Sequence, residues 1–383
     1  MESTRYLIVG GGMTGDAAAT GIRQHDSDGR IVLVGAEPHP PYERPLLSKG
    51  LWKGAPEEKV WREPAPGVEL RTGRRIIAID LEARYARDDA GGEYAWERLL
   101  LATGARPREI PGAEGVIWFR TLDDYRRVRE LARPGARAVV VGGGFIGSEL
   151  AAALAGAGVR VTMLFPDQGI GARMFPAELS AFVTDYYREQ GVEVLAGESV
   201  GDVEHGVVRT ASGRSLEADM VVAGLGVEPR TELAEAAGLS VGNGIVVDEL
   251  GRAGGRDDVF AAGDVASFPL PALGRRFRIE HEDHANTHGR VVGGNMAGAA
   301  DVYEHLPFFY SDLFDLGYEA VGEVDSRLDT VVHWEEPNRK GVIAYVDAER
   351  RPRGFLLWNV WDSVDAARER IRAGAPVDEG ALV

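Results

Sequence analysis

The sequence of 383 residues contains no cysteine, no long apolar run and fewer basic than acidic side chains. Without cysteine the chain can form no disulfide, no thiolate metal site and no dithiol relay for electrons. No apolar run approaches the about 20 residues that a membrane helix needs, so we expect no membrane span. The formal net charge of −17 disfavours nucleic acid and anionic membranes as partners.

The chain begins MESTRYLIVG, so its first expected strand starts almost at once. This leaves no room for the charged region, apolar stretch and cleavage site of a secretory signal, and we expect a cytoplasmic protein. The length predicts two or three domains, and 44% apolar residues are enough to fill their cores.

A glycine-rich turn occurs twice, as VGGGMTG at 9–15 and as VGGGFIG at 141–147. Each copy follows a short apolar strand and leads into an alanine-rich stretch of helical character. The three glycines allow a tight strand-to-helix turn, the approach of backbone to a pyrophosphate, and close packing of helix on strand. The phosphates then lie at the positive end of the helix. The glycines in this register are Gly10, Gly12 and Gly15, and Gly142, Gly144 and Gly147.

An acidic residue follows each glycine turn at the end of the next apolar strand. Glu37 follows IVLVGA and Asp167 follows VRVTMLFP, both about twenty residues past the last glycine. A carboxylate at this position binds the hydroxyls of a ribose. One such turn also occurs in proteins without a ligand, but this spacing found twice predicts two dinucleotide sites.

A second pair of segments repeats, LLLATGARPR at 99–108 and VVAGLGVEPR at 221–230. In each, an apolar strand runs into a glycine, Gly104 or Gly226, and then a proline. Each half of the chain therefore reads as a βαβ crossover, further strands and a closing strand. The sequence predicts an α/β protein with two Rossmann-like dinucleotide-binding domains.

We expect four ranges along the chain. Residues 1–112 form the first nucleotide domain and 113–244 the second. Residues 245–305 are too poor in apolar side chains for a domain of their own, so we expect them to return to the first. From 306 to 383 the pattern is alternating and aromatic, which predicts an antiparallel sheet followed by a last helix, a C-terminal α+β domain.

The chain resembles the FAD-dependent flavoproteins of the pyridine nucleotide-disulfide oxidoreductase type, in the branch of ferredoxin reductases and apoptosis-inducing factor. The resemblance covers the whole chain and rests on PYERPLLSKGLW, VVGGGFIGSEL, EHEDHANTHGRVVGGNMAGAA and YSDLFDLGYEAVGEVDS. It implies a glutathione reductase-like fold with FAD on the first glycine turn, NADH on the second and a C-terminal interface domain. It also implies that hydride passes from NADH to FAD N5 and that electrons then leave to an external acceptor.

The resemblance assigns roles to individual residues. It places Glu37 at the FAD ribose, Arg44 at FAD and Asp264 at the ribityl chain. Lys49 and Glu149 match a pair beside the flavin, where the lysine stabilises negative charge on the reduced ring and the glutamate holds the lysine. Further residues expected to contact a cofactor are Thr103, Gly104, Ile146, Gly226, Gly263, Glu280 and His281.

Three aromatic side chains are expected at the reacting ring. The resemblance makes Phe145 the aromatic that yields so that nicotinamide can stack on the flavin, with core packing as the alternative. His281 lines the flavin face, and Tyr310 stands where this branch usually carries a tryptophan. His284 and His288 lie close in sequence but lack supporting carboxylates, so we expect no metal site.

Asp167 also predicts which nicotinamide cofactor is used. A carboxylate about 5 Å from a 2′-phosphate costs roughly 3 kcal/mol at an effective dielectric of about 20. NADH should therefore be preferred to NADPH. Arg173, six residues on, matches a cationic position in the family and would soften this preference by contacting a phosphate.

The leading hypothesis is an NADH-dependent FAD oxidoreductase whose acceptor is a ferredoxin, a quinone, oxygen or a dye. Two alternatives stay open, a dedicated ferredoxin reductase and an NADH-responsive redox sensor with slow turnover and a charge-transfer complex. The resemblance further implies a homodimer whose assembly responds to NADH. The net charge of −17 argues against an acidic carrier unless an arginine cluster serves as its dock. The clusters are Arg71, Arg74 and Arg75; Arg275, Arg276 and Arg278; and Arg350, Arg351 and Arg353.

Overall fold

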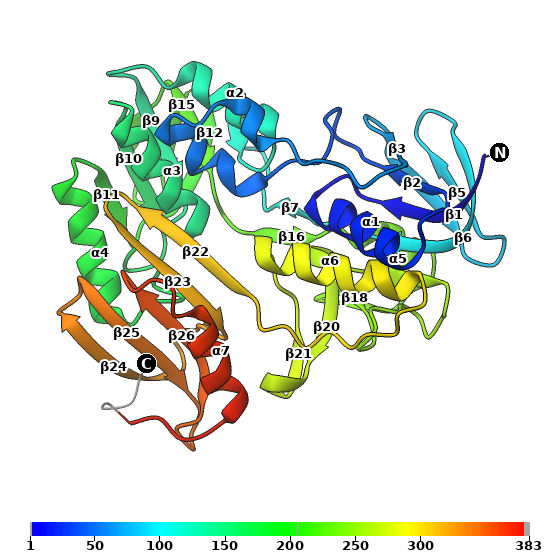
Figure 1. The fold of residues 1–383 in the computed structure, drawn as a ribbon. Helices are drawn as coiled ribbons and strands as arrows, with labels where there is room; N and C mark the ends of the chain where they lie inside the picture. The colour runs from blue at the N-terminus through cyan, green and yellow to red at the C-terminus, as the bar shows by residue number, and fades with distance from the viewer. Residues whose placement is uncertain (1, 205, 379–383) are drawn as a thin grey trace. The chain divides into compact units, whose positions relative to one another are not determined.

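The computed structural model describes residues 2–204 and 206–378. The chain divides into two compact units, each assembled from segments that are far apart in sequence (Figure 1). Unit 1 combines the chain up to Arg44 with Glu58–Arg106 and Glu228–Pro307. Unit 2 combines Pro45–Glu57, Pro107–Val227 and the chain from Phe308 onward.

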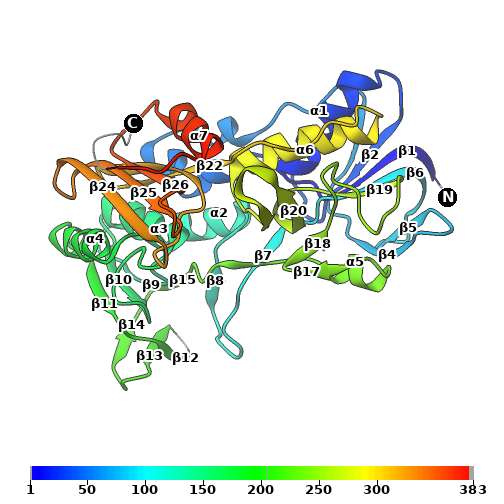
Figure 2. The same ribbon diagram turned by 90° about the horizontal axis from the view of Figure 1, so that it is seen from below.

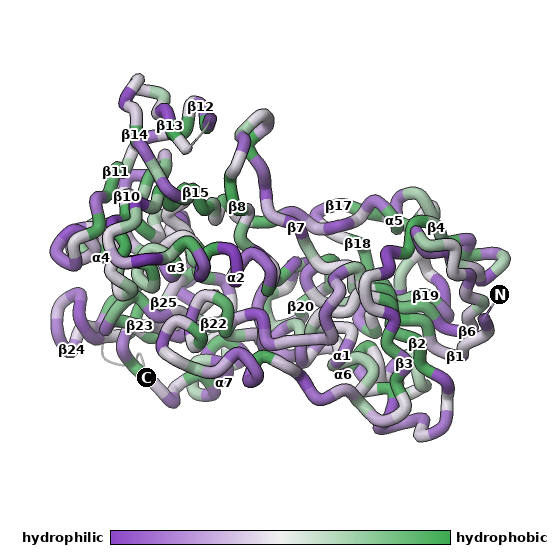
Figure 3. The backbone as a smooth tube through the Cα atoms, turned by 90° about the horizontal axis from the view of Figure 1, so that it is seen from above, coloured by the Kyte–Doolittle hydropathy of each residue, from purple (hydrophilic) through white to green (hydrophobic). Residues whose placement is uncertain are grey.

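Unit 1 is built on a sheet in the order β3-β2-β1-β6-β5-β4, with β19 beside β6. Its central strands are parallel, and their apolar residues are buried because helices and loops cover both faces. Figure 3 shows the hydrophobic tube along β2 and β19. The strands are β1 (Glu2–Val9), β2 (Ile31–Val34), β3 (Val68–Arg71), β4 (Ile76–Asp80), β5 (Tyr85–Asp88), β6 (Glu93–Leu101) and β19 (Val259–Ala261).

Helices α1 (Met13–His25) and α6 (Glu282–Met296) pack side by side against this sheet (Figure 1, blue and yellow). Glycines make this approach possible. A Cβ added at Gly293 would lie 2.1 Å from the carbonyl oxygen of Ala18, and one at Gly289 would lie 2.5 Å from that of Thr14. The two backbones are therefore too close for any side chain at these positions.

The stretch Glu228–Pro307 belongs to unit 1, although it follows the second glycine turn in sequence. Strand β19 pairs with β6, with Val259 opposite Leu99, and α6 packs on α1. A small four-stranded sheet stands beside them, in the order β17-β18-β20-β21. Its strands are β17 (Val241–Gly242), β18 (Gly244–Val246), β20 (Ala266–Leu270) and β21 (Arg275–Phe277), and α5 (Glu232–Ala236) precedes them.

Unit 2 contains a second parallel sheet, in the order β11-β10-β9-β15-β8 (Figure 2). Helices α2 (Leu122–Leu131), α3 (Phe145–Gly156) and α4 (Ala177–Glu189) connect its strands, and β12 (Val200–Glu204), β13 (Val207–Thr210) and β14 (Ser215–Glu217) form an antiparallel extension. The parallel strands are β8 (Val116–Trp118), β9 (Arg137–Val141), β10 (Arg160–Phe165), β11 (Glu193–Ala196) and β15 (Met220–Ala223).

The rest of unit 2 is an antiparallel sheet in the order β22-β23-β26-β25-β24, which we call the C-terminal sheet. Its aromatic face packs on the loop between β10 and α4 of the same unit, where Phe175 lies edge-on to Tyr318 and Trp358 at 5.5 and 5.4 Å. Helix α7 (Val364–Ala373) packs against β23 and β26. The strands are β22 (Phe308–Leu313), β23 (Leu316–Gly322), β24 (Asp329–Glu336), β25 (Lys340–Val346) and β26 (Pro352–Trp358).

The repeated segments seen in the sequence form two short connecting strands, β7 (Ala105–Pro107) and β16 (Val227–Pro229), which pair with each other. Gly104 and Gly226 precede them with φ of +67° and +81°. Glycine is needed at both positions because this backbone conformation is costly for residues with a Cβ.

The segment Pro45–Glu57 belongs to unit 2, although it lies within the first nucleotide domain in sequence. Trp52 lies edge-on to Tyr125 of α2 at 5.8 Å, Glu57 pairs with Arg126 at 2.6 Å, and Lys53 pairs with Asp312 of β22 at 2.6 Å. These contacts bring Lys49 to Glu149 after the second glycine turn, which in the sequence only the family resemblance indicated.

The substitution Gly293→Ala should lower the free energy of unfolding by about 1–3 kcal/mol, because the new methyl group would overlap the Ala18 carbonyl. Gly156→Ala at the end of α3 is the matched control, since a Cβ there meets no described atom within 4 Å. The control should be neutral or stabilising by up to about 1 kcal/mol. Urea unfolding followed by circular dichroism measures both, and equal losses would contradict the packing argument.

Candidate functional site

The first glycine turn shows why each of its glycines is needed. A Cβ at Gly10 would lie 2.0 Å from the Ala102 carbonyl oxygen, and one at Gly15 would lie 2.1 Å from that of Gly10. A Cβ at Gly12 would meet nothing within 4 Å among the described residues. The fold itself therefore accounts for the first and third glycine. The middle one, at the N-terminus of α1, leaves open space that suits a phosphate.

The second glycine turn has the same division of roles. A Cβ at Gly142 would lie 2.4 Å from the carbonyl oxygen of Gly224, and one at Gly147 would lie 2.0 Å from that of Gly142. Gly144 again faces open space in the described part of the chain, at the N-terminus of α3. Both turns thus fit the pyrophosphate of a dinucleotide.

Glu37 lies among cationic and hydroxyl groups in unit 1. Its Oε1 accepts from Arg44 at 2.9 Å and its Oε2 accepts from the Tyr42 hydroxyl at 2.6 Å. The Arg44 guanidinium also lies over the Tyr42 ring, 4.9 Å from its centroid. An ionised carboxylate has about four acceptor sites, so a ribose can still bind to Glu37. Burial by itself lowers the pKa of the Arg44 guanidinium, but Tyr42, Glu37 and Asp264 together raise this pKa above its usual value.

The segment after β19 packs against the first glycine turn. A Cβ at Gly263 would lie 2.2 Å from Thr14 Oγ1 in the first turn of α1. Next to it Asp264 is buried, and its carbonyl oxygen accepts from Arg278 at 3.2 Å. Unit 1 therefore brings Gly263 and Asp264 to the N-terminus of α1, where the first glycine turn lies.

Three further predicted residues lie in unit 1. Glu280 pairs with Arg278 at 2.5 Å, and His281 is the N-cap residue of α6. Thr103 donates its hydroxyl to the Arg230 carbonyl at 2.8 Å. This hydrogen bond holds the backbone of Arg230 next to β7 and β16.

His284 and His288 are core residues. Both are buried, and the His284 ring stacks on Phe268 with centroids 4.7 Å apart. His284 Nδ1 lies 3.0 Å from the Tyr303 hydroxyl, and Gly263 N donates to His288 Nδ1 at 3.3 Å. Among residues 2–204 and 206–378, no group of three or more His, Asp or Glu is placed to hold a metal ion.

Lys49 and Glu149 form a buried ion pair in unit 2. Lys49 Nζ lies 2.8 Å from Glu149 Oε1, and the Glu149 side chain is 2% exposed. A buried carboxylate is costly unless it is paired and hydrogen-bonded. The sequence placed these two residues together only through the family resemblance, and the structure brings them together.

Two serines that the sequence analysis missed complete this arrangement. Ser48 donates to Glu149 Oε2 at 2.6 Å, and Ser311 of β22 donates to Oε1 at 2.6 Å. Both carboxylate oxygens are therefore hydrogen-bonded by hydroxyls, and one also by the lysine. The available hint was a small polar residue beside each predicted site residue, in LLSKG and in FFYSD.

The predicted aromatic residues of unit 2 lie near this ion pair. Phe145 is 39% exposed and lies edge-on to Phe309 at 5.1 Å, which does not suit a residue of the core. Lys49 Nζ lies 5.0 Å from the centroid of the Tyr310 ring, within the range of a cation–π interaction. Ile146 is also exposed, next to Phe145.

Asp167 and Arg173 lie on one loop after β10. Arg173 Nε is 3.3 Å from Asp167 Oδ2, and the Arg173 side chain is 82% exposed. An exposed pair of this kind is weak, so a nucleotide can replace it.

Four of the nine arginines proposed as a dock form ion pairs of 3.0 Å or less within the chain. Exposed arginines held in this way present less net positive charge to a partner. The pairs are Arg71 with Glu2 and Glu69, Arg278 with Glu280, Arg351 with Asp347 and Glu349, and Arg353 with Glu323.

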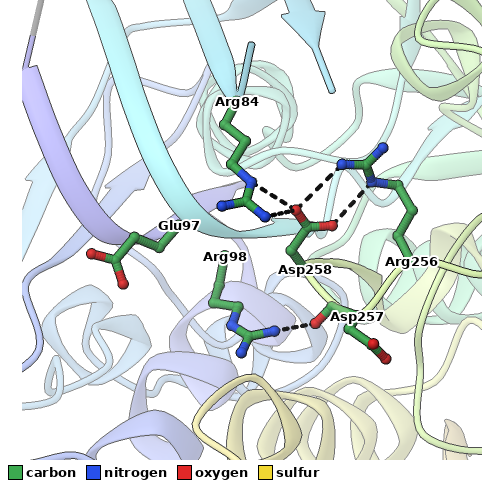
Figure 4. A pocket seen from close by; sticks show the side chains of 6 residues that line it. All are labelled: Arg84, Glu97, Arg98, Arg256, Asp257 and Asp258. Atoms are coloured by element: carbon green, nitrogen blue, oxygen red, sulfur yellow. Dashed lines mark hydrogen bonds and ion pairs between the residues drawn. The ribbon is translucent and has the colours of Figure 1, made fainter. Parts of the chain in front are cut away.

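A separate pocket of about 570 Å³ opens in unit 1 (Figure 4). Arg84 and Arg256 both bind the carboxylate of Asp258, at 2.9 and 3.0 Å. Arg98 donates to the Asp257 carbonyl, and Glu97 completes the lining. Arg256 also pairs with Glu82 at 2.6 Å, so Asp258 and Glu82 together balance the charges of Arg84 and Arg256. The residues that line the pocket contain no glycine turn for a dinucleotide.

Comparison with known proteins identifies the family. The model of the pyridine nucleotide-disulphide oxidoreductases matches residues 4–289. The chain belongs to this family. A second model, the C-terminal domain of mitochondrion-associated apoptosis-inducing factor, matches residues 292–339 of this oxidoreductase.

Similar proteins cover nearly the whole chain. The oxidoreductase is 34% identical to the ferredoxin–NAD(+) reductase component of the anthranilate 1,2-dioxygenase system of Burkholderia cepacia, over 99% of this chain and 96% of that protein. It is 31% identical to the mitochondrial apoptosis-inducing factor 1 of Dictyostelium discoideum, over 97% of this chain and 79% of that protein. The crystal structure of the covalent complex of putidaredoxin reductase with putidaredoxin contains a similar chain, with a TM-score of 0.93 and 30% identity. The match covers 100% of this chain and 96% of that chain.

The family confirms the predicted fold, an α/β protein with two Rossmann-like domains and a C-terminal α+β domain. The protein is an FAD-dependent NAD(P)H oxidoreductase, with FAD and NAD(H) as its cofactors. In the described part of the chain, no helix combines the length and apolar character that crossing a membrane requires.

Acid should destabilise the protein through its buried histidines. Burial lowers the pKa of His288 from 6.5 to about 3 and that of His284 well below 6.5, so both are neutral when folded. Unfolded chains bind these protons below about pH 6.5, so stability is lost as pH falls from there toward 3. For His288 alone the loss between pH 7 and 5 is about 2 kcal/mol.

The variant His288→Asn tests this by urea unfolding at both pH values. It should lose less stability than the parent between pH 7 and 5. His333→Asn, at an exposed position of β24, should keep the parental pH dependence. An identical pH dependence in all three proteins would refute the assignment.

Proposed function

We propose that the protein oxidises NADH and delivers electrons, through its FAD, to a small iron–sulfur protein of the ferredoxin type. The observation that carries this is the full-length similarity to a ferredoxin–NAD(+) reductase component, at 99% of one chain and 96% of the other. The absence of cysteine supports it, because electrons must leave the flavin directly for an external acceptor. A cytoplasmic location stays a prediction.

FAD is assigned to residues 1–112 and 245–305, NADH to 113–244, and the interface role to 306–383. When bound, FAD accepts a hydride from NADH and can release electrons singly. For FAD, Gly12 leaves room for the phosphates, while Gly10, Gly15 and Gly263 allow the close packing that forms the site around them. The polar partners that we propose for FAD are Glu37, Arg44, Thr103, Gly104, Asp264, Glu280 and His281.

For NADH, Gly142, Gly144 and Gly147 receive the pyrophosphate at the start of α3. Phe145 covers the place of the nicotinamide and turns aside when it binds. The remaining NADH contacts that we propose are Ile146, Asp167, Arg173 and Gly226.

Lys49 places positive charge where reduction creates negative charge, and Tyr310 and His281 border the same ring. Glu149 holds Lys49 in place, while hydrogen bonds from Ser48 and Ser311 orient its carboxylate. The attraction between two such charges about 4 Å apart is roughly 4 kcal/mol at an effective dielectric of about 20, before desolvation is subtracted. The pair therefore favours the reduced cofactor without leaving a lone buried charge.

A second candidate is an NADH-responsive sensor that turns over slowly and changes its assembly, such as formation of a homodimer. The match of residues 292–339 to the C-terminal domain of apoptosis-inducing factor favours it. The many ion-paired arginines also favour it mildly, because they weaken a dock for an acidic carrier.

Stopped-flow reduction with NADH, followed by reoxidation with a [2Fe–2S] ferredoxin, a quinone or oxygen, separates the candidates. Rapid reoxidation by the ferredoxin, slowed by added salt, is expected for the reductase. A long-lived charge-transfer band, together with a larger mass in light scattering after NADH addition, would instead support the sensor.

Lys49→Met should slow flavin reduction by NADH by ten- to a hundredfold while FAD stays bound, because Glu149 is left unpaired beside the ring. Lys53→Met is the matched control. Lys53 lies four residues after Lys49, is 61% exposed and pairs with Asp312, so the flavin of this variant should be reduced at the parental rate. An unchanged rate in Lys49→Met would remove Lys49 from the reaction.

Asp167→Asn should reduce the preference for NADH over NADPH by at least about tenfold, because the carboxylate no longer repels a 2′-phosphate. The ratio of kcat/KM values for the two cofactors measures this. Asp185→Asn, on the exposed face of α4, is the control and should keep the parental ratio. Equal use of NADH and NADPH by the parent protein would already refute the role of Asp167.

A further inference from the structure

We propose that the C-terminal sheet positions the loop that binds the adenosine ribose of NADH, and that Tyr345 is the positioning residue. The loop runs from 166 to 176, between β10 and α4, and carries Asp167 and Arg173. The inference rests on the proposed role of Asp167. It adds that NADH affinity depends on β25, a strand far in sequence from the loop that carries Asp167.

One side of the loop is fixed to the nucleotide-binding part of unit 2. Gly171 N donates to the Gly143 carbonyl in the second glycine turn at 2.8 Å. Gly197 N donates to the carbonyl oxygen of Asp167 at 2.9 Å. The ribose carboxylate and the phosphate turn are therefore joined through the backbone of this loop.

The other side of the loop is fixed to the C-terminal sheet at three consecutive residues. Ser326 N, just before β24, donates to the Arg173 carbonyl at 3.1 Å. The Tyr345 hydroxyl of β25 donates to the Met174 carbonyl at 2.7 Å. Phe175 is 2% exposed and packs edge-on against the aromatic rings of β23 and β26.

The simpler reading is that the Tyr345 hydroxyl only satisfies its own need for a partner, since a buried tyrosine usually finds one. The number of contacts to this loop indicates that Tyr345 also positions the loop. Three parts of the C-terminal sheet hold adjacent residues of one loop, while the Arg173 side chain remains 82% exposed. The backbone is thus held and the charged side chain is left available to a ligand.

This arrangement orders the loop before the nucleotide arrives. A mobile loop has to be ordered on binding, which weakens affinity without affecting the reacting ring. Loss of the Tyr345 anchor should therefore raise the KM for NADH and leave kcat unchanged.

The test is Tyr345→Phe, which keeps the ring and removes only the hydroxyl. The KM for NADH should rise about three- to tenfold, the value expected for a lost buried hydrogen bond, with kcat within about twofold of the parent. The inhibition constant of ADP-ribose, which lacks the nicotinamide, should rise by the same factor. Hydrogen exchange of residues 171–175 should accelerate in the protein without NADH.

The matched control is Tyr94→Phe in unit 1, which removes a buried hydroxyl that donates to Asp88 at 2.7 Å. It should leave the KM for NADH and the ADP-ribose constant unchanged. A rise of equal size in the control would mean that any lost tyrosine hydroxyl has this effect, and it would overturn the inference.

Combining Tyr345→Phe with Asp167→Asn separates this inference from the proposed function. The factor by which Tyr345→Phe raises the inhibition constant of ADP-ribose should be smaller in the Asp167→Asn background, because both changes act on one loop. If Asp167→Asn alone leaves the NADH to NADPH ratio unchanged, the ribose role of Asp167 fails. If Asp167→Asn changes the ratio but Tyr345→Phe leaves the ADP-ribose constant unchanged, the positioning role of Tyr345 fails.

Discussion

The buried carboxylate of Glu149 is the constraint on which the arrangement of unit 2 depends. It lies on α3 directly after the second glycine turn and needs a counter-charge and hydrogen bonds. Lys49 and Ser48 supply them from the segment 45–57, and Ser311 supplies one from the C-terminal sheet. A single buried side chain thus ties two separate parts of the sequence to the start of α3.

The two glycine turns show how a fold and a ligand share one motif. In both, the outer glycines are required by backbone atoms about 2 Å from where a Cβ would lie, whereas the middle glycine faces open space. Only the middle position thus leaves room for a ligand. Glycine is also required by close packing at Gly289 and Gly293, which let α1 and α6 approach each other. Gly263 is required in the same way because it lies against Thr14.

Much of the fold could be predicted, because its signals are local. The glycine spacing with Glu37 and Asp167 predicted both nucleotide sheets, and the alternating pattern after 306 predicted the C-terminal sheet, which β22 to β26 form. The family resemblance supplied Lys49 and Glu149. Ser48, Ser311 and Tyr345 were missed because a hydroxyl in a strand or loop carries no periodic pattern, and its partner is more than a hundred residues away.

The sequence by itself determined the two nucleotide turns, the lack of any internal thiol relay and the class of cofactors, since each depends on residue types at short, fixed spacings. Only the tertiary structure decided that the segment 45–57 joins unit 2, that Glu149 is held by two serines, and that the loop of Asp167 is anchored by Tyr345. The physical reason is that burial and hydrogen bonding depend on which distant segments meet, and no short window of sequence contains that information.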